Sequence, residues 1–185
     1  MLATGLTAAE FDRMVAEGSF DCLGPKKVEL LDGEICIMNP AGPIHDDFTD
    51  YLTEWSYANG APDHHRVRVQ CGIACDDNRP EPDVAWLKPG RYGKVRPQAS
   101  DILLLIEIAD SSLAADLKRK RRIYATGGIT EYWIMDIPQR QVHVMNRPAG
   151  EDYQDYQIIQ PPQPLAPTIR PEANLDLQDL FSVVD

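Results

Sequence analysis

Two acidic residues stand out because each lies beside or within a segment that is expected to be buried. Asp83 ends the polar loop PEPD at 80–83, and Glu107 lies near the end of the apolar run DILLLIEIAD at 101–110. Burying an unpaired charge costs several kcal/mol, so an acid in so apolar a segment indicates a use for it. If Asp83 and Glu107 meet at one edge of a sheet, their repulsion requires a cation or a proton between them.

Acids gathered in this way have a specific chemistry. One to three carboxylates with a backbone carbonyl suit Mg²⁺ or Mn²⁺, which keep several waters and bind substrate phosphates at their open positions. Glu34 is a candidate third acid, because it directly follows the Asp-Gly turn at 32–33. The alternative interpretation is that Glu34 is only an exposed hairpin residue.

A lysine on the helix predicted at 112–126 adds to the acids. At about 100° per residue, one narrow stripe of this helix carries Leu113, Leu117, Lys120 and Tyr124. Lys120 therefore lies on the face that should point at the sheet, where it needs a carboxylate partner or a polar cleft. The purely structural interpretation is that Lys120 forms an ion pair with Asp116, four residues earlier on the same helix. The functional one is a lysine that orients a metal-bound water and stabilises the charge on a pentavalent phosphate.

The elements that must position these residues can be read from periodicity and turn signals. The central one is ILLLIEI, which has no alternation and so favours a strand covered on both faces. The expected order is a helix from Thr7 to about Gly18, a hairpin at 28–38, a helix at 44–58, strands at 66–73, 84–87 and 102–108, a helix at 112–126, strands at 131–137 and 141–146, and a short terminal helix at 175–181.

This order predicts one α/β domain over residues 1–185, with a mixed β-sheet flanked by α-helices. A proline-rich extended connector at 160–172 leads to the short C-terminal helix. No apolar segment approaches the roughly twenty residues that span a bilayer, and the N-terminus has no secretion pattern. With four scattered cysteines, we expect a reduced, cytoplasmic protein that does not enter a membrane.

The net charge of −11 argues against nonspecific phosphate binding, which needs a basic surface. The distribution softens this objection, because nine of the 18 Lys and Arg residues lie in 88–96 and 118–122. In general, such runs of basic residues are interpreted as part of the solvated surface of a protein. The functional interpretation is steering of a nucleic-acid backbone by Lys88, Arg91, Lys94, Arg119, Arg121 and Arg122.

Several stretches together resemble a known family. PEPD, LLIEIA and Lys120 look like the core of the PD-(D/E)XK nuclease superfamily. More closely, VELLDGEICIM, EPDVAWL, LDLQDLF and the run from 104 through YATGGITEYWIMD resemble the Uma family of putative restriction endonucleases, formerly a domain of unknown function. One departure is ADSS at 109–112, where the family usually has a Ser-Pro-Ser-like turn.

The resemblance implies a restriction-endonuclease-like core of four or five mixed strands. By the resemblance, Asp83 and Glu107 hold Mg²⁺ or Mn²⁺ with the carbonyl of Ile108, and Glu34 matches the early acid that completes the site. The usual lysine two residues after the glutamate is replaced by alanine at 109, and Lys120 from the following helix substitutes for it. The implied catalytic residues are therefore Asp83, Glu107, Lys120 and Glu34.

The function expected from this is Mg²⁺-dependent endonuclease activity on nucleic acid, most simply DNA, by a homodimer that cuts both strands. Three alternatives remain. The first is a catalytically inactive nuclease fold that acts as a binding or regulatory module. The second is a different metal-dependent hydrolase built on His45, His64 or His65. The third is an interaction protein that uses Tyr132 and Trp133, although core packing explains these better.

Overall fold

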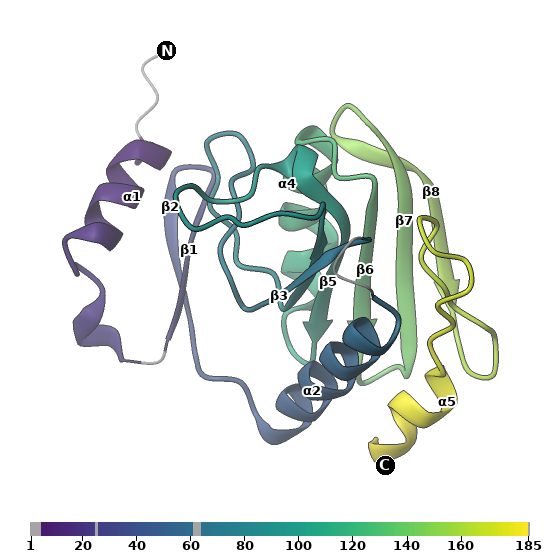
Figure 1. The fold of residues 1–185 in the computed structure, drawn as a ribbon. Coiled ribbons are helices and arrows are strands. Elements are labelled where there is room, and N and C mark those ends of the chain that lie inside the picture. The colour runs from purple at the N-terminus through teal and green to yellow at the C-terminus, as the bar shows by residue number, and fades with distance from the viewer. Residues whose placement is uncertain (1–4, 25, 61–63, 185) are drawn as a thin grey trace.

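The computed structural model describes residues 5–24, 26–60 and 64–184. Its centre is a six-stranded mixed sheet in the order β3-β4-β5-β6-β7-β8 (Figure 1). β5 and β6 are parallel, and every other neighbouring pair is antiparallel. The strands are β3 (Arg66–Val69), β4 (Val84–Leu87), β5 (Ile102–Ala109), β6 (Glu131–Asp136), β7 (Gln141–Ala149) and β8 (Asp152–Ile159).

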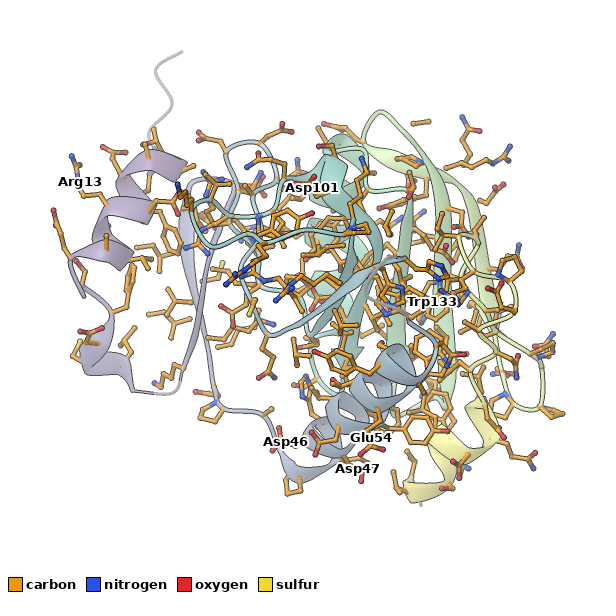
Figure 2. All side chains as sticks on the ribbon, in the orientation of Figure 1. Arg13, Asp46, Asp47, Glu54, Asp101 and Trp133 are labelled. Carbon is orange, nitrogen blue, oxygen red and sulfur yellow. The ribbon has the colours of Figure 1, made fainter. Side chains whose placement is uncertain are left out.

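One face of the sheet is covered by helix α2 (Pro43–Ala58) and by the C-terminal segment with helix α5 (Leu177–Leu180) (Figure 1). Side chains of both pack into one apolar cluster with Trp133 of β6, which Figure 2 labels within the core. The rings of Phe48 and Phe181 meet edge to face with their centroids 5.4 Å apart. The segment after the prolines therefore contributes to the main core.

The other face is covered by the helical stretch 113–126, which links the parallel strands β5 and β6. It consists of α3 (Leu113–Ala115), a π-helical turn (Asp116–Lys120) and α4 (Arg121–Thr126). Ile123 and Tyr124 of α4 pack in the second apolar cluster, which lies on this face of the sheet. Single-turn π segments inside helices are frequent at functional sites, and this one contains Lys120.

A separate two-stranded sheet, β1 (Lys27–Leu31) with β2 (Glu34–Met38), stands beside the main sheet. Its Asp-Gly turn has positive φ at both central residues, as a two-residue hairpin requires. Alternation along β1 divides its side chains between two faces. Val28 and Leu30 pack against Phe11 of helix α1 (Ala8–Ala16), so Lys27 and Glu29 point the other way, toward the main sheet.

The structure confirms the predicted fold class and most of the predicted elements. The capping box of Thr7 and Glu10 starts α1, and the hairpin, α2 and the 113–126 helix lie where expected. Several features differ. The strand predicted at 66–73 ends at Val69, and the strand predicted at 141–146 continues to Ala149. The sheet has six strands, because the polar, edge-lying β8 adds one beyond the predicted elements, and the 113–126 helix contains the π turn. Short 3₁₀ turns lie at Asp21–Leu23, Ala99–Asp101 and Phe181–Val183.

In the described part of the chain, no helix has the length and apolar character to cross a membrane.

Gly127, at the end of α4, gives the first testable prediction. A Cβ at this position would lie 2.3 Å from Sγ of buried Cys75, which is itself held by a hydrogen bond to the carbonyl of Ile123. We expect Gly127→Ala to lower the free energy of unfolding by about 1–3 kcal/mol through overpacking. Gly93→Ala, where a Cβ meets nothing within 4 Å, should cause no loss. Urea unfolding followed by circular dichroism compares the two; equal stabilities would contradict the prediction.

Candidate active site

A pocket of about 790 Å³ lies between the β1–β2 hairpin, the start of α2 and the adjoining ends of β4 and β5. Its lining is mostly polar and charged. The lining residues are Lys26, Lys27, Met38, Asn39, Pro40, Ala41, Gly42, His45, Asp46, Gln70, Glu81, Asp83, Glu107, Ile108, Asp110, Ser111, Ser112, Asp116 and Lys120.

Sheet register brings Asp83 and Glu107 to the same level. Val84 at the start of β4 pairs with Ile106 of antiparallel β5, so Asp83 lies beside the last residues of β5. The backbone N–H of Ile108 donates a hydrogen bond of 2.8 Å to Asp83 Oδ2. Lys27 Nζ lies 3.2 Å from Asp83 Oδ1, and His45 Nε2 lies 3.3 Å from Asp83 Oδ2. Strand β1 and helix α2 therefore both supply partners to this carboxylate.

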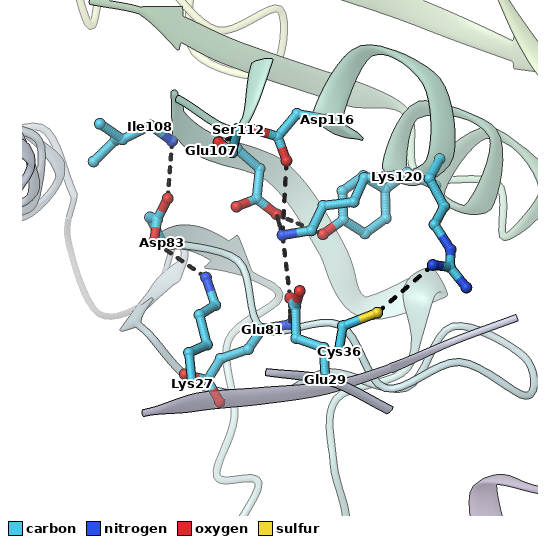
Figure 3. Close-up of polar contacts among 12 residues, drawn as sticks. Lys27, Glu29, Cys36, Glu81, Asp83, Glu107, Ile108, Ser112, Asp116 and Lys120 are labelled. Carbon is cyan, nitrogen blue, oxygen red and sulfur yellow. Dashed lines mark hydrogen bonds and ion pairs between the residues drawn. The ribbon is translucent and has the colours of Figure 1, made fainter. Parts of the chain in front are cut away.

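Glu107 projects from the face of β5 that the 113–126 helix covers. Along β5, Leu104, Ile106 and Ile108 pack on the α2 side, so alternation sends Glu107 to the opposite side. There Lys120 Nζ lies 3.0 Å from Glu107 Oε1, and the Tyr124 hydroxyl donates to the same oxygen at 2.7 Å. Figure 3 shows the Glu107 carboxylate between the lysine and Asp83.

Lys120 is the cationic centre of a buried cluster. Its side chain is only 2% exposed, and Nζ contacts Glu29 Oε1 at 3.1 Å and Asp116 Oδ1 at 3.8 Å as well as Glu107 (Figure 3). Both expectations for Lys120 are therefore met: it pairs with Asp116 at i, i+4, and its side chain points inward, toward the sheet. Glu29 Oε1 also accepts a 2.6 Å hydrogen bond from the N–H of Glu81, whereas Glu29 Oε2 is buried with no partner among the described residues.

The pocket carries more negative than positive side chains. Six acids line it against three lysines, and Glu29, which contacts Lys120, adds one more acid beside the lining; the acids of the lining are Asp46, Glu81, Asp83, Glu107, Asp110 and Asp116. This surplus favours the uptake of a further cation.

Burial and the neighbouring charges also shift the pKa values of the acids and of Lys120. Burial raises the pKa of Glu107, because Lys120 and Lys27 offset only part of the desolvation. Burial acts on Asp83 in the same direction, but the charge of Lys27 and the hydrogen bond from His45 outweigh it and lower the pKa. For Lys120, burial acts to lower the pKa and the surrounding carboxylates, Glu107 first, raise it well above its usual value. Lys120 is therefore an ammonium at neutral pH.

Glu34 lies outside this cluster. It pairs with Leu31 at the turn end of the hairpin, two residues or about 7 Å beyond the position of Glu29 along the strand. Its side chain is 73% exposed and its Oε2 lies 2.9 Å from Arg119 Nη2. The early acid beside Lys120 is thus Glu29, not Glu34, which differs from the expected arrangement.

The predicted nucleic-acid-binding cations fall into two groups. Arg119 pairs with Asp32 and Glu34, Arg122 with Asp32, and Arg121 with Asp152, so acids of the chain neutralise all three. The second group lies in the exposed loop after β4 and forms no ion pair within the described residues; it consists of Lys88, Arg91 and Lys94.

Of the three histidines weighed as ligands, only His45 lines the pocket. His65 is buried and stacks on Trp86 with ring centroids 3.9 Å apart, and His64 is exposed and bonded to Arg170. The sequence motifs did not identify Lys27, which lines the pocket, or Glu29, which contacts Lys120. The signal for both is the alternation of KVEL, which sets Lys27 and Glu29 on one face of β1.

The residues present fit a hard divalent ion. No group of three or more His, Cys, Asp or Glu side chains in the described ranges is arranged to hold a metal. Mg²⁺, however, binds through one or two carboxylates and leaves its other positions to waters and phosphates. Asp83 and Glu107 supply the two carboxylates. The N–H of Ile108 points at Asp83, and the carbonyl of a strand residue points to the same side as its N–H, so a third oxygen is available there.

Comparison with known proteins agrees with the fold. Residues 16–178 match the model of the Uma2 family, described as "Putative restriction endonuclease". Among curated proteins, none matches the chain. A solved structure, that of a "putative nuclease belonging to DUF820" from Anabaena variabilis ATCC 29413, is 18% identical with a TM-score of 0.77, covering 96% of this chain and 98% of that one. This likeness confirms the restriction-endonuclease-like fold. Because the family match spans most of its length, the chain belongs to the Uma2 family of putative restriction endonucleases.

Proposed function

We propose that this protein is a Mg²⁺- or Mn²⁺-dependent endonuclease that hydrolyses phosphodiester bonds of DNA. The observation that carries the proposal is the meeting of Asp83, Glu107 and Lys120 in one pocket, although they come from three separate segments of the chain. Membership of the Uma2 family supports the same class of activity. Fold alone does not determine activity, so the proposal depends on the chemistry of these side chains.

In this proposal the carboxylates of Asp83 and Glu107, with the carbonyl of Ile108, hold the divalent ion. When bound, such an ion lowers the pKa of water and neutralises charge on the phosphate. Lys27 is 3.2 Å from Asp83, so it lies beside the same group and is available to a phosphate oxygen once Asp83 takes a metal.

Lys120 is the residue that orients the attacking water. Its ammonium is fixed by Glu107, Glu29 and Asp116, so it enters the reaction with its position already set. An ammonium donates hydrogen bonds and accepts none, so Lys120 aligns the water and stabilises negative charge that develops on the phosphate. The water would attack phosphorus in line with the leaving oxygen: a new P–O bond forms, the P–O bond to the leaving sugar oxygen breaks, the water loses a proton to solvent, and the leaving oxygen takes one up as a hydroxyl.

A second candidate function follows from one observation. Asp83 already has Lys27 and His45 as partners, and Glu107 has Lys120 and Tyr124. A pocket in which the two acids proposed to hold the metal already have partners suits a nuclease fold that binds nucleic acid without cutting it. A divalent ion must compete with Lys27 for Asp83, which makes metal dependence the property that separates the two candidates.

The test incubates the full chain with supercoiled plasmid, linear duplex, single-stranded DNA and RNA, each with Mg²⁺, Mn²⁺ or EDTA. We expect nicking of DNA with either metal, none with EDTA, and loss of nicking in Glu107→Gln. Glu54→Gln, the same amide replacement on the exposed side of α2 (Figure 2), should cut like wild type. Folded wild-type protein that cuts no substrate with either metal would rule out the nuclease and favour the binding module.

We also propose a homodimer as the active form, because cleavage of both strands of a duplex requires two active sites. In the plasmid assay, a dimer should yield linear product as well as nicked circles. Sedimentation of the same sample gives the oligomeric state, and a monomer that produces only nicked circles would contradict the dimer.

A further inference from the structure

A second, smaller hollow of about 390 Å³ lies between the end of β3 and the loop that follows β4. We call it the basic groove; it is lined by Arg68, Cys71, Gly72, Tyr92, Gly93, Lys94, Val95 and Arg96. Three of these eight residues are cationic and none is acidic. In a chain with a net charge of −11, such a lining is the exception.

Two of the three cations have no partner within the chain. Arg68 and Lys94 form neither an ion pair nor a side-chain hydrogen bond with any residue that the structure describes, whereas Arg96 donates to Asp12 at 2.9 Å. The cations of 119–122 differ, since acids of the chain or the buried cluster hold them. Among the described residues, the basic groove thus adds two unpaired cations, Arg68 and Lys94, beside a pocket whose own lining has one, Lys26.

The basic groove adjoins the catalytic pocket through three consecutive residues. Gln70 lines the pocket, and Cys71 and Gly72 line the groove. The N–H of Gln70 donates a 2.9 Å hydrogen bond to the carbonyl of Asp83, which fixes the end of β3 beside the pocket. Arg68 is two residues before Gln70, so it lies about 7 Å further along the strand.

The face of the sheet that α2 covers, opposite the face that carries Arg68, has the opposite charge. Helix α2 starts at the pocket with Asp46 in its lining and carries further exposed acids along its length, among them Asp47 and Glu54 (Figure 2). A polyanion that occupies the pocket is repelled by α2 and attracted by the groove. The charges therefore favour one path for a bound polyanion, from the pocket toward the basic groove.

Tyr92 gives the groove a partly apolar wall. Its hydroxyl donates to the carbonyl of Lys88 at 3.0 Å, which holds the ring in the loop. Arg66 and Arg68 lie on one face of β3 by alternation, and their charges act on Tyr92: burial and Asp101 raise the pKa of its hydroxyl, and the two arginines oppose the rise. Tyr92 and Arg68 line the same hollow, which therefore combines an aromatic ring with a guanidinium group, as do sites that join phosphate contacts with an aromatic surface.

We propose that the basic groove binds the phosphate backbone of the nucleic-acid strand as it leaves the catalytic pocket, with Arg68 and Lys94 as the phosphate contacts. This inference rests on the proposed nuclease function and adds the path of the substrate. It assigns the binding to β3 and to the loop that follows β4, on the side of the pocket away from α2.

The experiment measures binding of a fluorescein-labelled 20-base-pair duplex by anisotropy, in EDTA to prevent cleavage, over a series of salt concentrations. The variants are Arg68→Gln/Lys94→Gln and the matched control Lys118→Gln/Arg140→Gln. The control removes the same two charges at exposed positions that lie in neither lining and form no ion pair in the described structure. Thermal melts establish that both variants are folded.

We expect the groove variant to bind the duplex about tenfold or more weakly at 0.1 M salt, and its plot of log K against log salt to be shallower by about 2, because two phosphate contacts are lost. The control should match wild type. A groove variant that matches the control, while wild type binds and cleaves, would overturn the groove and leave the nuclease intact. Wild type that neither binds nor cleaves would overturn both.

Discussion

Replacing Lys120 with methionine is expected to lower the free energy of unfolding by about 3–5 kcal/mol at pH 7. Methionine keeps the length of the side chain and removes its charge. Glu107, Glu29 and Asp116 would then remain buried without the cation that all three contact. Removal of one partner from a buried ion pair is costly because the remaining acid must either stay charged without its counter-ion or take up a proton, and here three acids lose the same partner.

Urea unfolding followed by circular dichroism measures the change. Lys118→Met, on the same helix but exposed and without an ion pair in the described structure, should alter the free energy of unfolding by no more than about 0.5 kcal/mol. Adding Glu107→Gln to Lys120→Met should recover part of the loss, because one of the uncompensated charges is gone. A loss below about 1 kcal/mol for Lys120→Met would show that this lysine is not the counter-ion of the cluster.

Asp83→Asn is expected to reduce metal-dependent cleavage at least about 100-fold. Removing a residue that only supports a metal ligand costs 10- to 100-fold, and a direct ligand should cost no less. Asparagine keeps the shape of the side chain and can still accept the 2.8 Å hydrogen bond from the N–H of Ile108. Lys27 and His45 lose a charged partner, so some stability is lost as well.

Initial nicking rates, measured where the variant is shown to be folded, check this prediction. Asp47→Asn, an equal change at an exposed position of α2, controls for the loss of one negative charge (Figure 2). If Asp83→Asn cuts within threefold of wild type, Asp83 is not a metal ligand and the site must be sought elsewhere in the pocket.

The fold was largely predictable because its elements carry strong local signals. The Asp-Gly turn has positive φ at both residues, as a two-residue hairpin needs, and the apolar run of β5 is buried on both faces. β8 escaped prediction for an equally physical reason. It is an edge strand whose burial is intermittent, so the alternation that identifies a half-buried strand is weak.

The candidate site was predictable where one element decided the geometry. The helical stripe that includes Lys120 follows from about 100° per residue, and the structure buries Lys120 and Tyr124 on the side that faces Glu107. The meeting of Asp83 with β5 follows from the antiparallel pairing of neighbouring strands. Both inferences need only a local period or one strand pair.

Contacts between distant segments were not predictable in the same way. His45 reaches Asp83 only because α2 starts at the pocket, and no sequence period encodes that docking. To predict that Glu29, and not Glu34, contacts Lys120, one must know where the hairpin lies along the 113–126 helix. A shift of two residues, about 7 Å, separates a contact with Lys120 from one with Arg119. Alternation shows which residues share one face of a strand, but tertiary packing decides which of them makes the contact.

The central claim is that the carboxylates of Asp83 and Glu107 together hold a divalent ion in one pocket. Calorimetric titration of Mn²⁺ into wild type, Asp83→Asn and Glu107→Gln tests it without any substrate. We predict that wild type binds the ion and that either single replacement weakens binding strongly. Wild type that takes up no Mn²⁺, or two variants that bind it as wild type does, would contradict the claim.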